Sequence, residues 1–210
     1  MKYFIKKLIS KQDLNDGEMG SAFDTIMSGG ANDTLIGAFL VALRAKGEKP
    51  SEIASAARIM REKALKVDVD FDVVDTCGTG GDGALTFNIS TAVAFVLAGA
   101  GFKVAKHGNR SVSSSCGSAD VLEKLGINIE ASPEKVGQYI DRVGIGFLFA
   151  PVFHSSMRYA IGPRKEVGLR TIFNVLGPLT NPAGARYQLV GVYDEALCEP
   201  LAQVLGRLGA

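Results

Sequence analysis

The residues that could do chemistry gather first in a glycine-rich run, Asp75-Thr-Cys-Gly-Thr-Gly-Gly-Asp-Gly83, which leads to Asn88-Ile-Ser-Thr91. Glycines let the backbone turn tightly and aim successive N–H groups at a ligand. A helix beginning near Ser90 would add unpaired N–H groups and a positive dipole end. The run therefore predicts a pyrophosphate cradle, with an ordinary strand-to-helix turn as the alternative. Asp82 within it suggests a contact to sugar hydroxyls or to hydrated Mg²⁺.

A second polar run, Lys106-His-Gly-Asn-Arg-Ser-Val-Ser-Ser-Ser-Cys-Gly-Ser118, follows another apolar segment. Lys106 and Arg110 can neutralise phosphate charge, and the serines offer hydroxyl donors. Ser118 is expected to cap the next helix. The neutral-range pKa of histidine allows a general base at His107, but an orienting or stacking role is preferred, and His154 carries the same ambiguity.

The surrounding elements predict an α/β protein with two styles of sequence. Residues 1–66 have helical spacing and predict a small helical bundle, which helices within 153–182 are expected to join. Residues 67–152 and 183–210 alternate short apolar strands with helices, which predicts a mostly parallel sheet flanked by helices, its ligand site at the carboxyl ends of the strands. The expected strands are Phe71–Asp75, Phe102–Lys106, Ile127–Ile129, Ile145–Phe149 and Tyr187–Val192. The expected helices include Asn15–Met27, Thr34–Gly47, Glu52–Lys66, Ser90–Gly99, Ala119–Leu125, Ser132–Val143, two between Phe153 and Leu176, and Glu195–Leu208.

Composition narrows the class of protein. Lys+Arg 23 against Asp+Glu 22 gives a net charge of +1, which argues against a nucleic-acid or membrane-surface partner. The longest uncharged apolar run, Ala92–Phe102, is too short to span a bilayer. Three scattered cysteines and an N-terminus without an apolar signal region predict a cytoplasmic protein with reduced thiols.

Taken in order, these motifs resemble a known family. Gly78-Thr-Gly-Gly-Asp82, Asn88-Ile-Ser-Thr91 and Lys106-His-Gly-Asn-Arg110 are similar to the signature of anthranilate phosphoribosyltransferases, as are Arg164 and the run Arg170–Pro182. The resemblance implies transfer of a phosphoribosyl group from 5-phosphoribosyl-1-pyrophosphate to the amine of anthranilate, in tryptophan biosynthesis. It also implies a nucleoside phosphorylase/phosphoribosyltransferase-like fold and a homodimer formed through the helical domain.

The resemblance further implies a set of site residues. Lys106 and Asp82 are expected to be catalytic, Ser90 to contact Mg²⁺, and Gly78, Asn109 and Arg164 to contact anthranilate. The expected contacts to the phosphoribosyl donor are Gly78, Gly81, Asp82, Thr86, Asn88, Ile89, Ser90, Thr91, Lys106, His107, Gly108, Asn109, Arg110, Ser111, Val112, Ser113, Ser114 and Ser118.

One departure from the family pattern concerns the metal. The family carries an Asp-Glu pair for Mg²⁺, and no such pair occurs here in a matching context, since Asp194-Glu195 follows a different strand. Half a metal site and an inactive isolated chain are therefore expected. Two alternatives stay open, a pyrimidine nucleoside phosphorylase-like enzyme and a non-catalytic relative that binds nucleic acid.

Overall fold

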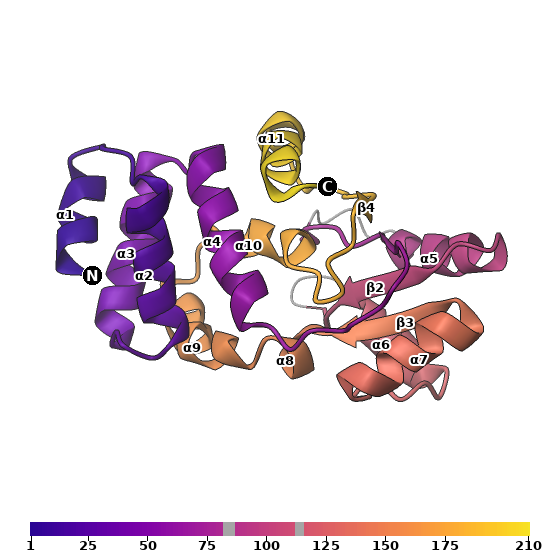
Figure 1. Ribbon diagram of the computed structural model, residues 1–210. Helices are drawn as coiled ribbons and strands as arrows, with labels where there is room; N and C mark the ends of the chain where they lie inside the picture. The colour runs from indigo at the N-terminus through magenta and orange to yellow at the C-terminus, as the bar shows by residue number, and fades with distance from the viewer. Residues whose placement is uncertain (82–86, 112–115) are drawn as a thin grey trace.

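The computed structural model describes residues 1–81, 87–111 and 116–210. Helices fill one end of the molecule and a parallel sheet with its helices fills the other (Figure 1). Asp82, Thr86, Val112, Ser113 and Ser114, all expected site residues, lie outside the described ranges.

The helical end begins with α1 (Lys2–Ile9), α2 (Asp16–Met27), α3 (Asp33–Lys46) and α4 (Pro50–Lys63). Asn15 and Asn32 cap α2 and α3 by accepting from backbone N–H groups three residues on, as their positions before apolar periodic runs predict. Helix α4 ends at Lys63, three residues before the expected Lys66.

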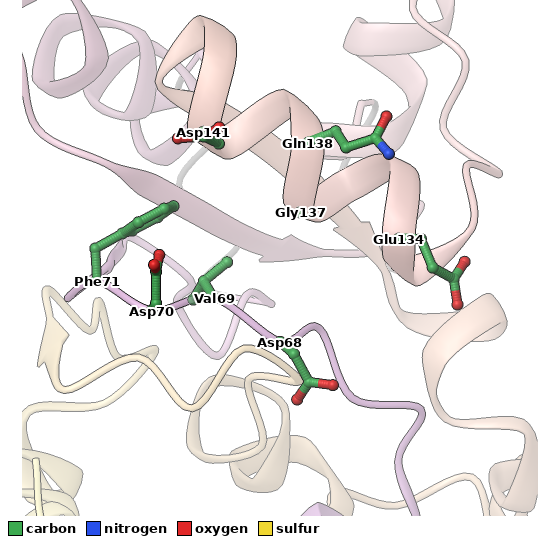
Figure 2. Close-up of a pocket in the computed structure, with 8 residues that line it drawn as sticks. All are labelled: Asp68, Val69, Asp70, Phe71, Glu134, Gly137, Gln138 and Asp141. Carbon is green, nitrogen blue, oxygen red and sulfur yellow. The ribbon is translucent and has the colours of Figure 1, made fainter.

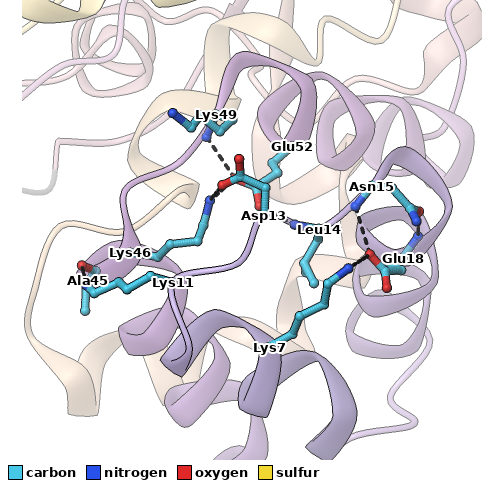
Figure 3. Close-up of polar contacts among 10 residues, drawn as sticks. All are labelled: Lys7, Lys11, Asp13, Leu14, Asn15, Glu18, Ala45, Lys46, Lys49 and Glu52. Carbon is cyan, nitrogen blue, oxygen red and sulfur yellow. Dashed lines mark hydrogen bonds and ion pairs between the residues drawn. The ribbon is translucent and has the colours of Figure 1, made fainter.

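A cluster of charged groups joins these helices. The carboxylate of Glu52 is fully buried and accepts from the backbone N–H groups of Leu14 and Lys49 and from Lys46 Nζ at 2.7 Å (Figure 3). Lys46 Nζ also contacts Asp13 at 2.6 Å. One buried ion pair thus fixes the linker between α1 and α2 to the turn between α3 and α4.

The sheet has four parallel strands in the order β3-β2-β1-β4. They are β1 (Val74–Asp75), β2 (Val104–Gly108), β3 (Ile145–Phe149) and β4 (Tyr187–Gln188), and the helices between them are α5 (Ile89–Gly99), α6 (Ser118–Lys124) and α7 (Pro133–Val143). The expected parallel α/β fold class is confirmed.

Several predicted elements need correction. The first and last strands contain two residues each, and β2 lies two residues later than expected. No strand forms over Ile127–Ile129, because the N–H of Ile127 closes the end of α6 by donating to Leu122 O and the side chain of Asn128 accepts from the N–H of Glu130. The last expected helix is a short 3-10 turn, η3 (Glu195–Leu197), followed by α11 (Cys198–Leu208).

The returning segment passes through α8 (Ala150–Phe153), η1 (Ser155–Met157), α9 (Arg158–Val167), α10 (Phe173–Leu176) and η2 (Gly177–Leu179). Its buried residues Ala160, Ile172 and Phe173 belong to the same core as α2, α3 and α4, and so do Leu201 and Val204 of α11. The domain boundaries expected from the sequence stay a prediction. Helix α11 lies within the range 183–210, which was expected to belong to the sheet domain, but it packs against the helical core.

Candidate functional site

The two polar loops leave the same edge of the sheet. Strands β1 and β2 are neighbours, with Val74 opposite Val104, so the residues after Asp75 and after Gly108 both follow carboxyl ends of parallel strands. Ligands of open parallel sheets bind at this edge. This topology brings together the motifs that the sequence separates by about thirty residues.

The described part of the glycine loop is shaped by close backbone approaches. Gly80 and Gly81 have φ values of +65° and +73°, which side chains rarely tolerate. A Cβ on Gly78 would lie 2.8 Å from Gly191 O, the same carbonyl that accepts from the N–H of Thr79 at 2.9 Å. Within the described ranges, the N–H groups of Gly78, Gly80 and Gly81 have no hydrogen-bond partner. They are available to an anion.

The start of α5 supplies the next group of donors. Asn88 precedes the helix, and its side-chain oxygen accepts from Thr91 Oγ1 at 2.9 Å and Ser90 Oγ at 3.4 Å. Ile89, the first residue of the helix, has an exposed side chain. Lys106 Nζ lies 3.4 Å from Ser90 Oγ, and Lys106 is only 2% exposed. A buried cation therefore stands beside a helix N-terminus, where both favour a bound anion.

Asp75 was not among the expected site residues, but its side chain hydrogen-bonds to three other residues of the site. Its carboxylate is fully buried and accepts from Asn181 Nδ2 at 2.7 Å, Cys77 N at 3.0 Å and His107 N at 3.1 Å. Burial raises its pKa to about 6, although these hydrogen bonds and the charge of Lys106 act in the opposite direction. A carboxylate ending an apolar strand is the signal that could have identified it.

Lys106 and His107 lie on opposite faces of β2, as successive strand residues must. The His107 ring is buried, donates from Nδ1 to Gly177 O at 3.0 Å, and lies 5.1 Å from the His154 ring. Burial lowers the pKa of His107 to about 3 and that of His154 to about 4, so both are neutral near pH 7. This environment fits the preferred orienting role better than proton transfer.

At the start of the second loop, the backbone of Gly108 lies too close to the side chain of Ser118 for a larger residue to fit. A Cβ on Gly108 would lie 2.3 Å from Ser118 Oγ. Ser118 does not cap α6 as expected: it is the first residue of the helix and donates to Asn109 O, while Asp120 accepts from the N–H groups of Ser111 and Gly117.

Arg110 also has protein partners. Its guanidinium pairs with Glu123 at 2.8 Å and with Asp120 at 3.2 Å. A phosphate contact by Arg110 stays a prediction, and it would require this exposed pairing to rearrange.

Arg164 lies on α9, which packs against α3. Its guanidinium carbon lies 5.1 Å from the centroid of the Phe173 ring, and burial lowers its pKa. In the part of the chain that the structure describes, the guanidinium has no hydrogen-bond or ion-pair partner. A planar cation on the helical side could receive a carboxylate. The exposed Asn109 is carried by the sheet side.

Two other features, a group of possible metal ligands and a cavity, are poorly suited to bind a metal ion and a phosphate, respectively. Asp75, Cys77 and His107 offer ligand atoms within 4.8 Å of one another, but the Asp75 oxygens already accept N–H groups and burial raises the pKa of Cys77 to about 12. A cavity of about 500 Å³ lies between the segment Asp68–Phe71 and α7 (Figure 2). Its carboxylates would repel a phosphate.

Comparison with known proteins agrees with this geometry. A family model described as "Glycosyl transferase family, helical bundle domain" matches residues 2–64, and one described as "Glycosyl transferase family, a/b domain" matches residues 70–210. The chain belongs to this glycosyl transferase family. The resemblance expected from the glycine and lysine motifs is confirmed by its similarity to curated anthranilate phosphoribosyltransferases.

Members of the glycosyl transferase family give close matches in sequence and structure. The chain is 59% identical over 211 residues to anthranilate phosphoribosyltransferase of Persephonella marina, covering 100% of this chain and 62% of the relative. The enzyme from Thermus thermophilus superposes with a TM-score of 0.95 at 48% identity, over 99% of this chain and 63% of that one. The Saccharomyces cerevisiae enzyme "in complex with PRPP and Mg" gives a TM-score of 0.91 at 32% identity, over 99% and 62%.

The chain thus spans about 62% of the length of the curated relatives it matches. No helix in the described ranges is both long and apolar enough to cross a lipid bilayer.

Proposed function

We propose that this chain provides the phosphoribosyl pyrophosphate-binding part of an anthranilate phosphoribosyltransferase. The observation that carries the proposal is the convergence of the unpaired glycine-loop N–H groups, the N-terminus of α5 and the buried Lys106 at one sheet edge. The reaction would join the amine of anthranilate to the anomeric carbon of the sugar as pyrophosphate leaves. We further propose a cytoplasmic homodimer with no nucleic-acid or membrane partner.

Catalysis would depend on positioning and on charge. As the anomeric carbon gains oxocarbenium character, negative charge grows on the departing pyrophosphate, and fixed N–H groups and Lys106 would stabilise it. An aromatic amine is neutral at pH 7, so no strong general base is needed. Arg164 would hold the carboxylate of anthranilate on the helical side, with Asn109 and Gly78 facing it from the sheet side.

Ser90 is the described residue expected to hold Mg²⁺, which when bound would neutralise part of the charge of the phosphates. Ser90 Oγ would supply one protein oxygen to the metal, and Lys106 Nζ lies 3.4 Å from this oxygen.

Loss of anthranilate fluorescence in the presence of 5-phosphoribosyl-1-pyrophosphate and Mg²⁺ tests the proposal. We would compare the 210-residue chain with a version extended at its C-terminus to the length of the relatives. Fluorescence loss by the extended version that requires the donor supports the proposal. Phosphorolysis of uridine or thymidine without this activity would instead identify the nucleoside phosphorylase alternative.

A further inference from the structure

Arg170 connects the helical end of the molecule to the glycine loop. Its Nη2 donates to Gly81 O at 2.5 Å, and its guanidinium carbon lies 3.9 Å from the centroid of the Tyr193 ring. The residues that follow it, Ile172 and Phe173, are buried in the helical core. A residue next to a segment of the helical core therefore holds a loop that leaves the sheet.

The same loop is held from a second direction. The N–H of Tyr193 donates to Thr79 Oγ1 at 3.1 Å, and the N–H of Thr79 donates to Gly191 O at 2.9 Å. Tyr193 is thus hydrogen-bonded to the glycine loop through its backbone and stacked on Arg170 through its ring. Arg170 therefore contacts both the glycine loop, at Gly81, and the segment after β4, at Tyr193.

The chemistry of the contact suits an arginine. Arg170 is exposed, and among the described residues it has no carboxylate within ion-pair distance. A planar guanidinium can donate in its plane to Gly81 O while its face stacks on an aromatic ring, which a lysine ammonium cannot do together. The contact occupies the carbonyl of Gly81, whereas the N–H groups of Gly80 and Gly81 have no partner among the described residues.

We propose that Arg170 is a positioning residue that fixes the glycine loop in its anion-binding form and couples it to the helical end. The identity of the anion rests on the proposed function, but the positioning role does not. Loops with two left-handed glycines have many accessible conformations, so an external contact is needed to select one.

The test measures amide hydrogen exchange of residues 77–81 in the whole chain, together with binding of inorganic pyrophosphate by calorimetry. Arg170→Ala should speed exchange in this segment about tenfold or more, because a charge-assisted hydrogen bond is lost. Pyrophosphate affinity should fall about tenfold for the same reason. Arg170→Lys should restore part of both effects. Arg186→Ala, which removes an exposed arginine near Asp72, is the matched control and should change neither.

The outcomes separate the two proposals. Unchanged exchange over residues 77–81 in Arg170→Ala would overturn the positioning role, whatever the chain binds. Faster exchange in a chain whose unsubstituted form does not bind pyrophosphate would support the positioning role and contradict the proposed function. Full restoration by Arg170→Lys would overturn the role of stacking on Tyr193.

Discussion

A lysine that is 2% exposed in the middle of a central strand needs a compensating charge, and at Lys106 two are available. The carboxylate of Asp75 is close enough for Lys106 to lower its pKa, and a bound anion would be the other partner. Lys106→Met keeps an unbranched side chain of similar size but removes the charged ammonium group with its donors. We expect pyrophosphate to bind about 10- to 100-fold more weakly, since charge-assisted hydrogen bonds are lost, as measured by calorimetry.

The exposed Lys124→Met on α6 is the control for this substitution and should bind as the parent chain does. Turnover of the C-terminally extended protein should fall with Lys106→Met in the same direction. Parent-like pyrophosphate affinity in Lys106→Met would show that the anion lies elsewhere.

The buried histidines predict how stability depends on pH. The folded pKa values of His107 and His154, about 3 and about 4, lie below the unfolded value of about 6.5, so acid favours the unfolded chain. Asp75 acts in the opposite direction, because its folded pKa of about 6 lies above its unfolded value of 3.8. Near pH 5 the unfolded chain therefore binds about one proton more, and the free energy of unfolding falls by about 1.4 kcal/mol for each unit of acidification.

Urea unfolding at pH 7, 6 and 5 measures this slope. His154→Gln removes one of the two protons that the unfolded chain takes up, so its slope near pH 5 should be close to zero. A slope unchanged by this substitution would mean that His154 titrates in the folded protein much as it does in the unfolded chain.

At the scale of elements, the buried pair of Lys46 and Glu52 decides how the first four helices fit together. Removing one charge leaves the other buried, which costs about 3–5 kcal/mol. We expect Lys46→Met and Glu52→Gln each to destabilise the chain by about this amount in urea unfolding, and the double variant to lose less than the sum. Lys7→Met, which breaks the more exposed contact with Glu18, should cost about 1 kcal/mol or less.

How far the sequence predicts these elements depends on whether their causes are local. Asparagine caps and apolar periodicity are local, so the starts of α2 and α3 were predictable to within a residue. The extended segments around β1 and β4 form only two ladder positions each, because the chain beyond them bonds to loops instead: Thr79 pairs with Gly191. No local pattern encodes that choice.

In the candidate site, too, the features that depend on local sequence were predictable and the contacts between distant residues were not. Glycine, serine and lysine motifs predict an anion cradle, because those residue types have few other reasons to gather after strands. The environment of Asp75 and the contact between Arg170 and Tyr193 join residues far apart in the chain, so they required the structure. The role of His107 in the site stays a prediction, and only the structure shows that its ring is buried against His154.

For the whole molecule, the position of α11 matters most, because it follows the last strand but contributes to the helical core. Leu201 is 2% exposed and Val204 is fully buried, both in the cluster formed by α2, α3 and α4. Arg61 on α4 reinforces this contact, since its Nε donates to Leu179 O at 2.7 Å and its Nη1 to Leu208 O at 3.4 Å. The chain therefore crosses from the sheet back to the helices before it reaches Ala210.

Leu201→Ala tests which unit α11 stabilises. A cavity in a well-packed core costs about 2–5 kcal/mol, so we expect urea unfolding to reveal a loss of that size. If α11 belongs energetically to the helical end, hydrogen exchange should rise in α4 and α11 while β2 and β3 keep their protection. Gln203→Ala, which alters an exposed residue of the same helix, should leave both regions unchanged. Equal loss of protection in α4 and β3 would instead mean that the helices and the sheet unfold as a single cooperative unit, with the contacts of Arg61 and Arg170 strong enough to join them.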